Sequence, residues 1–152
     1  MNISFDLDST LIPNGKEFET ENISTIAKLF GVEEIRKGTT KLIFNLQKRG
    51  HKVHIYTTSF RSKRKIRYTL KYYGIKVNRV INEKENRQIL NSLNNNASKF
   101  PPAFNFHIHI DDLKGVEIEG NKYGFKTIII NPSDKDWVIK INNKIKELEN
   151  LI

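Results

Sequence analysis

Short apolar runs rich in β-branched residues alternate along this chain with longer stretches whose apolar residues recur at helical spacing. Five of these runs are expected to form strands, and they cover residues 3–5, 52–57, 77–81, 106–110 and 126–130. Because strand-like and helix-like segments alternate, the pattern predicts an α/β fold. We expect a three-layer, Rossmann-like parallel sheet of about five strands with helices on both of its faces.

Helix-like stretches fill the segments between these runs. Helices are expected over residues 17–30 and 39–49. Gly50 and Gly74 follow helix-like stretches at points where a residue with positive φ ends a helix. A last helix is expected near the C-terminus, with Ser133 as its N-cap.

Composition narrows the class of protein. The chain has 152 residues and no cysteine, which excludes a disulfide scaffold, a thiolate zinc site and thiol catalysis. No linker divides it, so residues 1–152 are expected to form a single domain. The first residues lack the pattern of a secretory signal, and no run approaches the roughly 20 apolar residues of a membrane span. We therefore expect a cytoplasmic protein without a membrane partner.

The positive charge of the chain is concentrated in one segment. The formal net charge is +9, and residues 61–76 contain seven basic residues and no acidic one, so the rest carries only +2. A basic helix attracts polyanions, which makes nucleic acid one candidate partner. The chain is also rich in Lys, Asn and Ile throughout, and such a bias accumulates surface lysines without a partner. The sequence leaves both interpretations open.

Pairs of carboxylates follow two of the expected strands. Asp6 and Asp8 come at the end of the first run, and Asp111 and Asp112 follow the fourth. Because parallel strands end at one edge of a sheet, these side chains are expected to converge. Two such charges about 4 Å apart repel by roughly 4 kcal/mol at an effective dielectric constant of about 20, so the cluster requires a cation. A ligand set made only of oxygens suits Mg²⁺.

The run Asp6-Leu7-Asp8-Ser9-Thr10 resembles the D-x-D-x-T signature of the haloacid dehalogenase (HAD) superfamily of phosphohydrolases. Later residues agree with that family in order, since Thr57 ends the second strand-like run and Asp111-Asp112 ends the fourth. The resemblance covers residues 3 to 130 approximately, and it implies a HAD-type fold.

The resemblance also implies an activity and residue roles. The activity is Mg²⁺-dependent hydrolysis of a phosphomonoester through an aspartyl-phosphate, with Asp6 as nucleophile and Asp8 as general acid and base. Thr57 is implied to donate a hydrogen bond to a phosphoryl oxygen. The implied metal ligands are Asp6, the backbone carbonyl of Asp8 and Asp111, and Asp112 is implied to support the ion.

The family further places a lysine between the third and fourth strands, and two residues qualify. Lys99 lies shortly before Pro101-Pro102, in a pattern similar to that of the family. Lys84 directly follows the third strand-like run, at the edge where the carboxylates are expected. Lys99 is favoured, and Lys84 stays open as the alternative.

Substrate size follows from the lengths of the connecting segments. In HAD enzymes a cap is inserted before the second strand or after the third, and both segments are short here. An open site without a large cap is therefore expected, and such sites are associated with bulky or macromolecular phosphorylated substrates. The alternative hypothesis is a nucleic-acid or phospho-partner binding module that uses the basic helix over residues 61–76 and keeps a degenerate HAD site.

Other candidate residues are assigned to packing. His107 and His109 alternate on the fourth strand, which favours a sheet face beneath a helix over a metal site. Trp137 and the Tyr72-Tyr73 pair are expected to pack on amphipathic helices.

Overall fold

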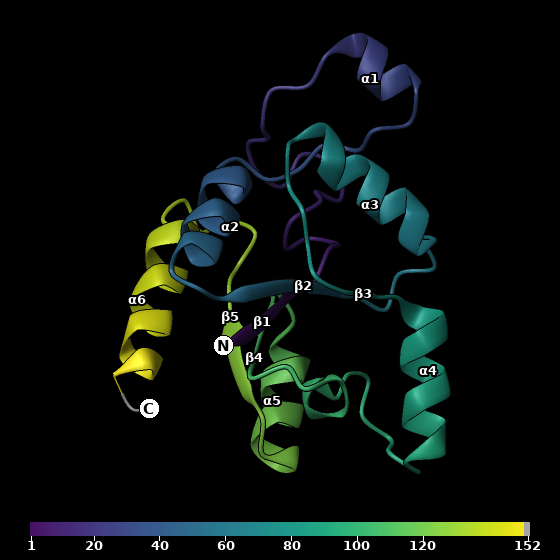
Figure 1. Cartoon of the computed structure of the whole chain (residues 1–152), viewed down its shortest axis with the longest axis vertical. Coiled ribbons are helices and arrows are strands. Elements are labelled where there is room, and N and C mark those ends of the chain that lie inside the picture. The colour runs from purple at the N-terminus through teal and green to yellow at the C-terminus, as the bar shows by residue number, and fades with distance from the viewer. Residues whose placement is uncertain (151–152) are drawn as a thin grey trace.

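The computed structural model describes residues 1–150, and its five strands form one parallel sheet. The strand order is β3-β2-β1-β4-β5, so the first strand lies in the centre (Figure 1). The strands are β1 (Asn2–Phe5), β2 (Lys52–Tyr56), β3 (Val80–Ile81), β4 (Ile108–Asp111) and β5 (Lys126–Ile129). The predicted α/β architecture is confirmed.

The third strand is shorter than its apolar run predicted. Asn78 N donates a hydrogen bond to Val53 O, but Val53 N donates to the side-chain Oδ1 of Asn78 rather than to a backbone carbonyl. A side chain therefore interrupts the ladder before β3 begins.

Helices cover both faces of the sheet, as predicted. Figure 1 shows α2 and α3 on one side of the sheet and α4 and α5 on the other. The longer helices are α2 (Thr39–Lys48), α3 (Lys63–Tyr72), α4 (Glu83–Ser92), α5 (Lys114–Tyr123) and α6 (Trp137–Glu149), and a 3-10 turn covers Pro101–Phe104. Within the described residues, no helix combines the length and the apolar character needed to cross a membrane.

Successive side chains of the central strands point to opposite faces of the sheet, and both faces are buried but differ in composition. Ile3 and Phe5 of β1 lie in the larger apolar core, to which α2, α3 and α6 contribute. The opposite face of the sheet carries polar and aromatic residues that are also buried: Ser4, His54, Tyr56 and His109. The side chain of Asp111 shares this second face, because it lies two residues after His109 on β4.

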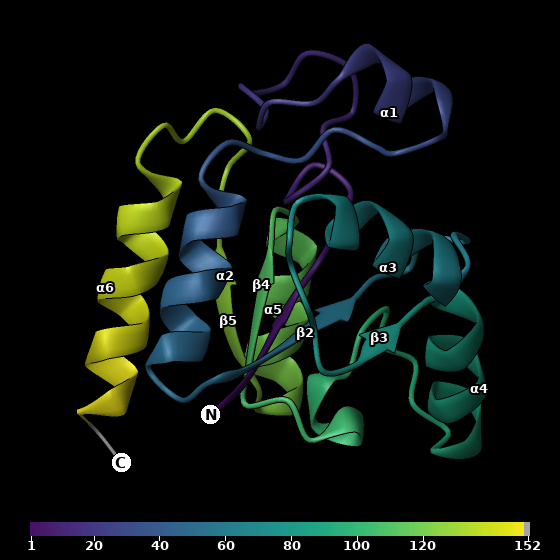
Figure 2. The same cartoon turned by 45° about the horizontal axis from the view of Figure 1, so that its top comes forward.

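The expected helix over residues 17–30 is wrong for most of that range. Only α1 (Thr25–Leu29) is helical there. Glu21 N instead donates to Ile35 O at 2.8 Å, as part of a short antiparallel contact within the segment. Pairing between neighbouring backbones thus replaces the intrahelical bonds that the periodicity predicted. Residues 12–38 form an insertion, which Figure 2 shows at the top of the molecule beyond the carboxyl end of β1.

The start of the last helix also differs from the prediction. Ser133 does not cap α6, because its backbone N and its hydroxyl both donate to Asn131 Oδ1 in a turn. The helix begins four residues later, at Trp137.

Arg36 fixes the insertion to the segment that follows β5. Its guanidinium lies between the rings of Phe18 and Trp137, at 4.5 and 4.8 Å from their centroids. Nη2 of Arg36 also donates to the carbonyl oxygens of Asn131, Pro132 and Asp134. A cleft of about 1010 Å³ opens between the insertion and residues 132–138.

Candidate active site

Three carboxylates meet at the edge of the sheet where β1 and β4 end side by side. Asp6 directly follows β1, and its backbone N donates to Ile110 O at 2.9 Å. Carboxylate oxygens of Asp6, Asp111 and Asp112 lie within 4.8 Å of one another. Parallel strand ends thus bring together three of the four acids that the sequence singled out.

Lys99 neutralises the two buried members of this cluster. Its Nζ lies 2.8 Å from Oδ1 of Asp6 and 2.6 Å from Oδ2 of Asp111, and its side chain is only 3% exposed. Burial alone would lower the pKa of Lys99, but the charges of both aspartates and the hydrogen bonds to them outweigh burial and raise it. Lys84 is exposed in the first turn of α4, so the structure places Lys99 rather than Lys84 at the carboxylates.

His109 supports Asp111, a role that the sequence analysis missed. Nε2 of His109 lies 3.0 Å from Oδ2 of Asp111, and its Nδ1 lies 2.9 Å from Oγ of Ser4. Burial lowers the pKa of His109, so its ring is neutral. A proton on Nε2 then donates to Asp111, and Nδ1 accepts from the Ser4 hydroxyl. The two-residue spacing from His109 to Asp111 is the signal that identifies this contact; His107 is exposed and lies outside it.

Asp111 and Asp112 experience opposite electrostatic environments. Burial opposes ionisation of Asp111, but the hydrogen bond from His109 and the charge of Lys99 hold the pKa of Asp111 well below its usual value. Burial raises the pKa of Asp112, and the neighbouring charge of Asp111 adds to this effect. Asp112 Oδ1 accepts a hydrogen bond from Thr10 Oγ1 at 3.1 Å, which connects it to the segment after β1.

The segment that carries Lys99 is fixed by two polar residues from neighbouring elements. Phe100 N donates to Tyr56 Oη at 2.8 Å, and Asn86 Nδ2 donates to Ser98 O at 2.9 Å. Tyr56 Oη donates in turn to Asn86 Oδ1 at 2.5 Å, so β2, α4 and this segment share one network. Burial raises the pKa of Tyr56, which keeps its hydroxyl protonated for this bond.

Asp8 lies apart from the other carboxylates. Its side chain is 52% exposed, and both of its oxygens accept hydrogen bonds from Nη1 of Arg61, at 2.8 and 3.1 Å. Nε of Arg61 also donates to both oxygens of Glu33, each at 3.0 Å. Burial alone would lower the pKa of Arg61, but the hydrogen bonds to these acids and their charges raise it. In the sequence Arg61 is one of the cations of the basic segment, and no local pattern reveals this connection between the insertion and the loop after β2.

Thr57 directly follows β2, at the same edge of the sheet as Asp6. It is buried, its backbone N donates to Ile81 O at 3.0 Å, and its Oγ1 accepts from Ser59 N at 3.1 Å. The Thr57 hydroxyl donates to none of the described residues, which leaves its hydrogen for a ligand at this edge.

The carboxylates fit a hard divalent cation. Asp6 Oδ1 is buried and, beyond its contact with Lys99, accepts no well-directed hydrogen bond from any described residue. Together with Asp111 and Asp112 it offers oxygen ligands only, which Mg²⁺ and Ca²⁺ prefer. These three residues would hold such an ion.

Comparison with known proteins adds evidence on the fold. No family model and no curated protein matches the chain. A chain in the structure of the Pnkp1/Rnl/Hen1 RNA repair complex resembles it with a TM-score of 0.55 and 18% identity, over 86% of this protein and 42% of that chain. This protein therefore spans less than half the length of that chain. A predicted HAD-like family hydrolase from Porphyromonas gingivalis resembles it with a TM-score of 0.52 and 15% identity, over 95% of this protein and 97% of that chain. The chain thus has a HAD-like fold.

Proposed function

We propose that this protein is a Mg²⁺-dependent phosphomonoester hydrolase that forms an aspartyl-phosphate on Asp6. The observation that carries the proposal is the position of Lys99, a buried cation in contact with both Asp6 and Asp111. A buried ammonium at this distance pairs with the Asp6 carboxylate and fixes it at the edge of the sheet, where it can act as the nucleophile. It also offers positive charge to the phosphoryl oxygens as charge develops on them.

The proposed reaction has two displacements at phosphorus. A carboxylate oxygen of Asp6 attacks and forms a P–O bond, while the P–O bond to the leaving group breaks and Asp8 gives the leaving oxygen a proton. Asp8 then takes a proton from water, whose oxygen attacks phosphorus and breaks the bond to Asp6. Inorganic phosphate leaves, and both carboxyl groups return to their starting states.

Two side chains assist these steps, and the carboxylates would hold a metal ion. Lys99 and the Thr57 hydroxyl donate to phosphoryl oxygens and orient them. Asp6, Asp111, Asp112 and the Asp8 backbone carbonyl would hold Mg²⁺, which would supply positive charge against the repulsion between the carboxylates and the incoming phosphate.

The general acid starts from a paired state. Because both oxygens of Asp8 accept from Arg61, at least one of these bonds must open, and the carboxyl must take up a proton from solvent, before Asp8 can protonate the leaving group. Glu33 holds the Arg61 guanidinium while this happens. Asp8 is exposed, so a bulky leaving group has access to it, which supports the proposal of a macromolecular or otherwise bulky phosphorylated substrate.

The test is hydrolysis of an aryl phosphate with Mg²⁺, with EDTA, and by the Asp6→Asn variant. We expect turnover that needs both the ion and Asp6, because Asn cannot act as the carboxylate nucleophile. Glu147→Gln is a matched control, since it removes one exposed carboxylate on α6. Full activity of Asp6→Asn would refute the mechanism.

A binding module is the second candidate, and the basic segment over residues 61–76 is the feature that favours it. The likeness to a chain of an RNA repair complex is compatible with a nucleic-acid partner in either case. A folded protein that binds Mg²⁺ and polyanions but hydrolyses no phosphomonoester would favour the module over the enzyme.

A further inference from the structure

The outer face of α3 carries aromatic and basic side chains in turn. Arg64, Arg67, Tyr68 and Lys71 recur at intervals of three and four residues, opposite the buried face formed by Ile66, Thr69 and Leu70. Phe60 precedes them in the loop that leads into the helix. We call the five exposed residues the aromatic-basic stripe: Phe60, Arg64, Arg67, Tyr68 and Lys71.

The cations of the stripe have no carboxylate partner among the described residues. Arg61 and Lys63, which lie between Phe60 and Arg64 in the sequence, pair with carboxylates of Asp8, Glu33 and Glu85. Within the part of the chain that the structure describes, no carboxylate pairs with Arg64, Arg67 or Lys71. Arg67 donates only to a backbone carbonyl, that of Val77, at 3.1 Å. The stripe is therefore a line of three uncompensated positive charges.

The aromatic members are exposed to a degree that packing does not explain. Phe60 is 87% exposed and Tyr68 is 47% exposed. A compositional excess of lysine accounts for surface cations, but it does not account for the exposed rings of Phe60 and Tyr68 next to them in the sequence. Flat apolar rings beside cations are the combination on which unpaired nucleobases stack while their phosphates are neutralised.

One end of the stripe lies at the candidate active site. Phe60 belongs to the loop between Thr57 and Arg61, which is closed by hydrogen bonds from Ser59 N to Thr57 Oγ1 and from Arg61 N to Ser59 Oγ. Arg61 contacts Asp8 directly. A chain that places its terminal phosphate at Asp6 would therefore meet Phe60 first and the cations of α3 next.

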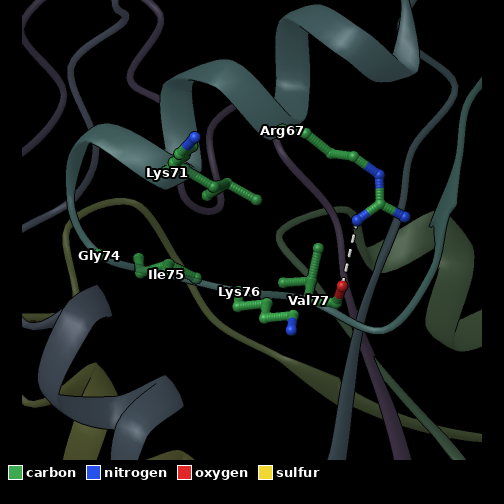
Figure 3. Close-up of a pocket in the computed structure, with 7 residues that line it drawn as sticks. Arg67, Lys71, Gly74, Ile75, Lys76 and Val77 are labelled. Atoms are coloured by element: carbon green, nitrogen blue, oxygen red, sulfur yellow. Dashed lines mark hydrogen bonds between the residues drawn. The ribbon is translucent and has the colours of Figure 1, made fainter.

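The other end of the stripe borders a small cleft. This cleft measures about 350 Å³ and is formed by the end of α3 and the segment that leads to β3. Its walls combine apolar side chains with the cations Arg67, Lys71 and Lys76, and Figure 3 shows Arg67 reaching from the helix to the Val77 carbonyl. This cleft therefore combines apolar and cationic side chains, as the stripe does, at a greater distance from the candidate active site.

We propose that the phosphorylated substrate is the end of a single-stranded nucleic acid, whose neighbouring nucleotides lie along the aromatic-basic stripe. This inference rests on the proposed phosphohydrolase function and names its substrate class. A single strand fits better than a phosphopeptide, because it presents a phosphate and a stackable base at every nucleotide. A duplex fits less well, because its bases are already stacked and paired.

The test compares two substrates of one enzyme. Values of kcat/KM are measured for a ten-nucleotide single strand with a phosphate at its 3′ or 5′ end and for an aryl phosphate, over a range of salt concentrations. Phe60→Ala should lower kcat/KM for the strand by about tenfold, the range of one lost base stack, and leave the aryl phosphate unchanged. The pair Arg64→Gln and Lys71→Gln should make the slope of log kcat/KM against log salt shallower by about 1.4.

Matched controls separate the stripe from net charge. Lys41→Gln with Lys146→Gln removes two exposed charges from α2 and α6, and should change the slope for the strand by much less. Equal losses in the stripe and control variants would overturn the proposal, and so would a higher kcat/KM for a phosphoserine peptide or a duplex than for the single strand.

Failure of the enzyme is distinguishable from failure of the stripe. If the parent hydrolyses neither substrate, the proposed function fails together with the assignment of nucleic acid as substrate. Fluorescence anisotropy with the labelled strand then shows whether the stripe binds nucleic acid: weaker binding by the Arg64/Lys71 variant alone means that it does, and equal binding by all variants means that it does not.

Discussion

At the scale of single residues, His109 connects the polar interior of the sheet to the candidate site. It donates to Asp111 and accepts from Ser4, and all three side chains are buried. A carboxylate that must hold a cation has two oxygens to orient, and a fixed donor on one of them sets the direction of the other. His109 is therefore a positioning residue for Asp111.

We expect His109→Leu to lower kcat for an aryl phosphate by about 10- to 100-fold, the usual cost of losing a partner of a metal ligand. His109→Gln should retain most of the activity, because its amide can still donate to Asp111. Steady-state kinetics over a Mg²⁺ titration measures both variants. Equal losses in the two variants would mean that the imidazole acts through packing alone.

His54 makes the stability of the fold depend on pH. Both of its ring nitrogens are buried without a hydrogen-bond partner among the described residues. Burial, with the charges of Arg79 and Lys52, lowers the pKa of His54 from 6.5 to about 4. Between these values the unfolded chain binds more protons than the folded one, so the free energy of unfolding falls as the pH falls. Neutral His54 makes its full contribution to the free energy of unfolding above pH 6.5. About 3 kcal/mol of this free energy is lost as the pH falls toward 4.

We expect His54→Leu to remove this part of the pH dependence and to raise the free energy of unfolding at pH 5, because Leu leaves no polar atom unpaired. Urea unfolding at pH 5 and pH 7.5 measures the difference. His107→Gln, at an exposed position just before β4, serves as the control. A parent and a His54→Leu variant with the same pH dependence would contradict the assignment.

At the scale of elements, Lys99 reaches the carboxylates only because separate elements hold its segment. Tyr56 from β2 and Asn86 from α4 bond to each other and to the backbone on both sides of Lys99. The segment has no regular structure of its own between α4 and the 3-10 turn, so these contacts replace the rigidity of a helix or strand.

Tyr56→Phe should therefore affect activity as well as stability. The change leaves Phe100 N without its acceptor and Asn86 without its donor, which costs about 1–3 kcal/mol in the free energy of unfolding. We also expect a lower kcat, because Lys99 loses its fixed position. Urea unfolding and aryl phosphate kinetics test this, and Tyr123→Phe on α5 is the matched control. Loss of stability with an unchanged kcat would show that Lys99 is positioned without Tyr56.

Residues of the site that lie at strand ends could be predicted from the sequence. Its contacts between residues far apart in the sequence could not. Asp6 and Asp111 end apolar runs of period two, so their convergence follows from a parallel sheet alone. The contacts of Arg61 with Glu33, and of Tyr56 with Asn86, join residues 28 and 30 positions apart and leave no local pattern. The same holds for the backbone pairing that replaced the expected helix over residues 17–30.

At the scale of the whole molecule, an ion at the carboxylates would bind two strands together. Asp6 directly follows β1 and Asp111 ends β4, two strands that are far apart in the sequence and adjacent in the sheet. Because the unfolded chain does not hold these acids together, an ion bound here stabilises the folded state as a whole.

We expect Mg²⁺ at about 100 times its dissociation constant to add about 2.7 kcal/mol to the free energy of unfolding. For a chain of this size, that corresponds to a rise in Tm of roughly 5–10 °C. Thermal unfolding with MgCl₂, against NaCl at equal ionic strength, measures the effect. Asp111→Asn should abolish the rise and Glu147→Gln should preserve it, whereas an equal shift with NaCl would argue against a specific site.

The central position of β1 has a consequence for the order in which the protein is assembled during synthesis. Of the five strands of this sheet, β1 is made before the others, and β2 can pair with one of its edges and β3 with β2 as they emerge from the ribosome. Its other edge pairs only with β4, so it stays unpaired until residue 108 and those after it have been made. The nascent chain thus carries an open strand edge from the synthesis of β1 until that of β4, and the pairing that finally closes this edge is the same one that brings Asp111 to Asp6.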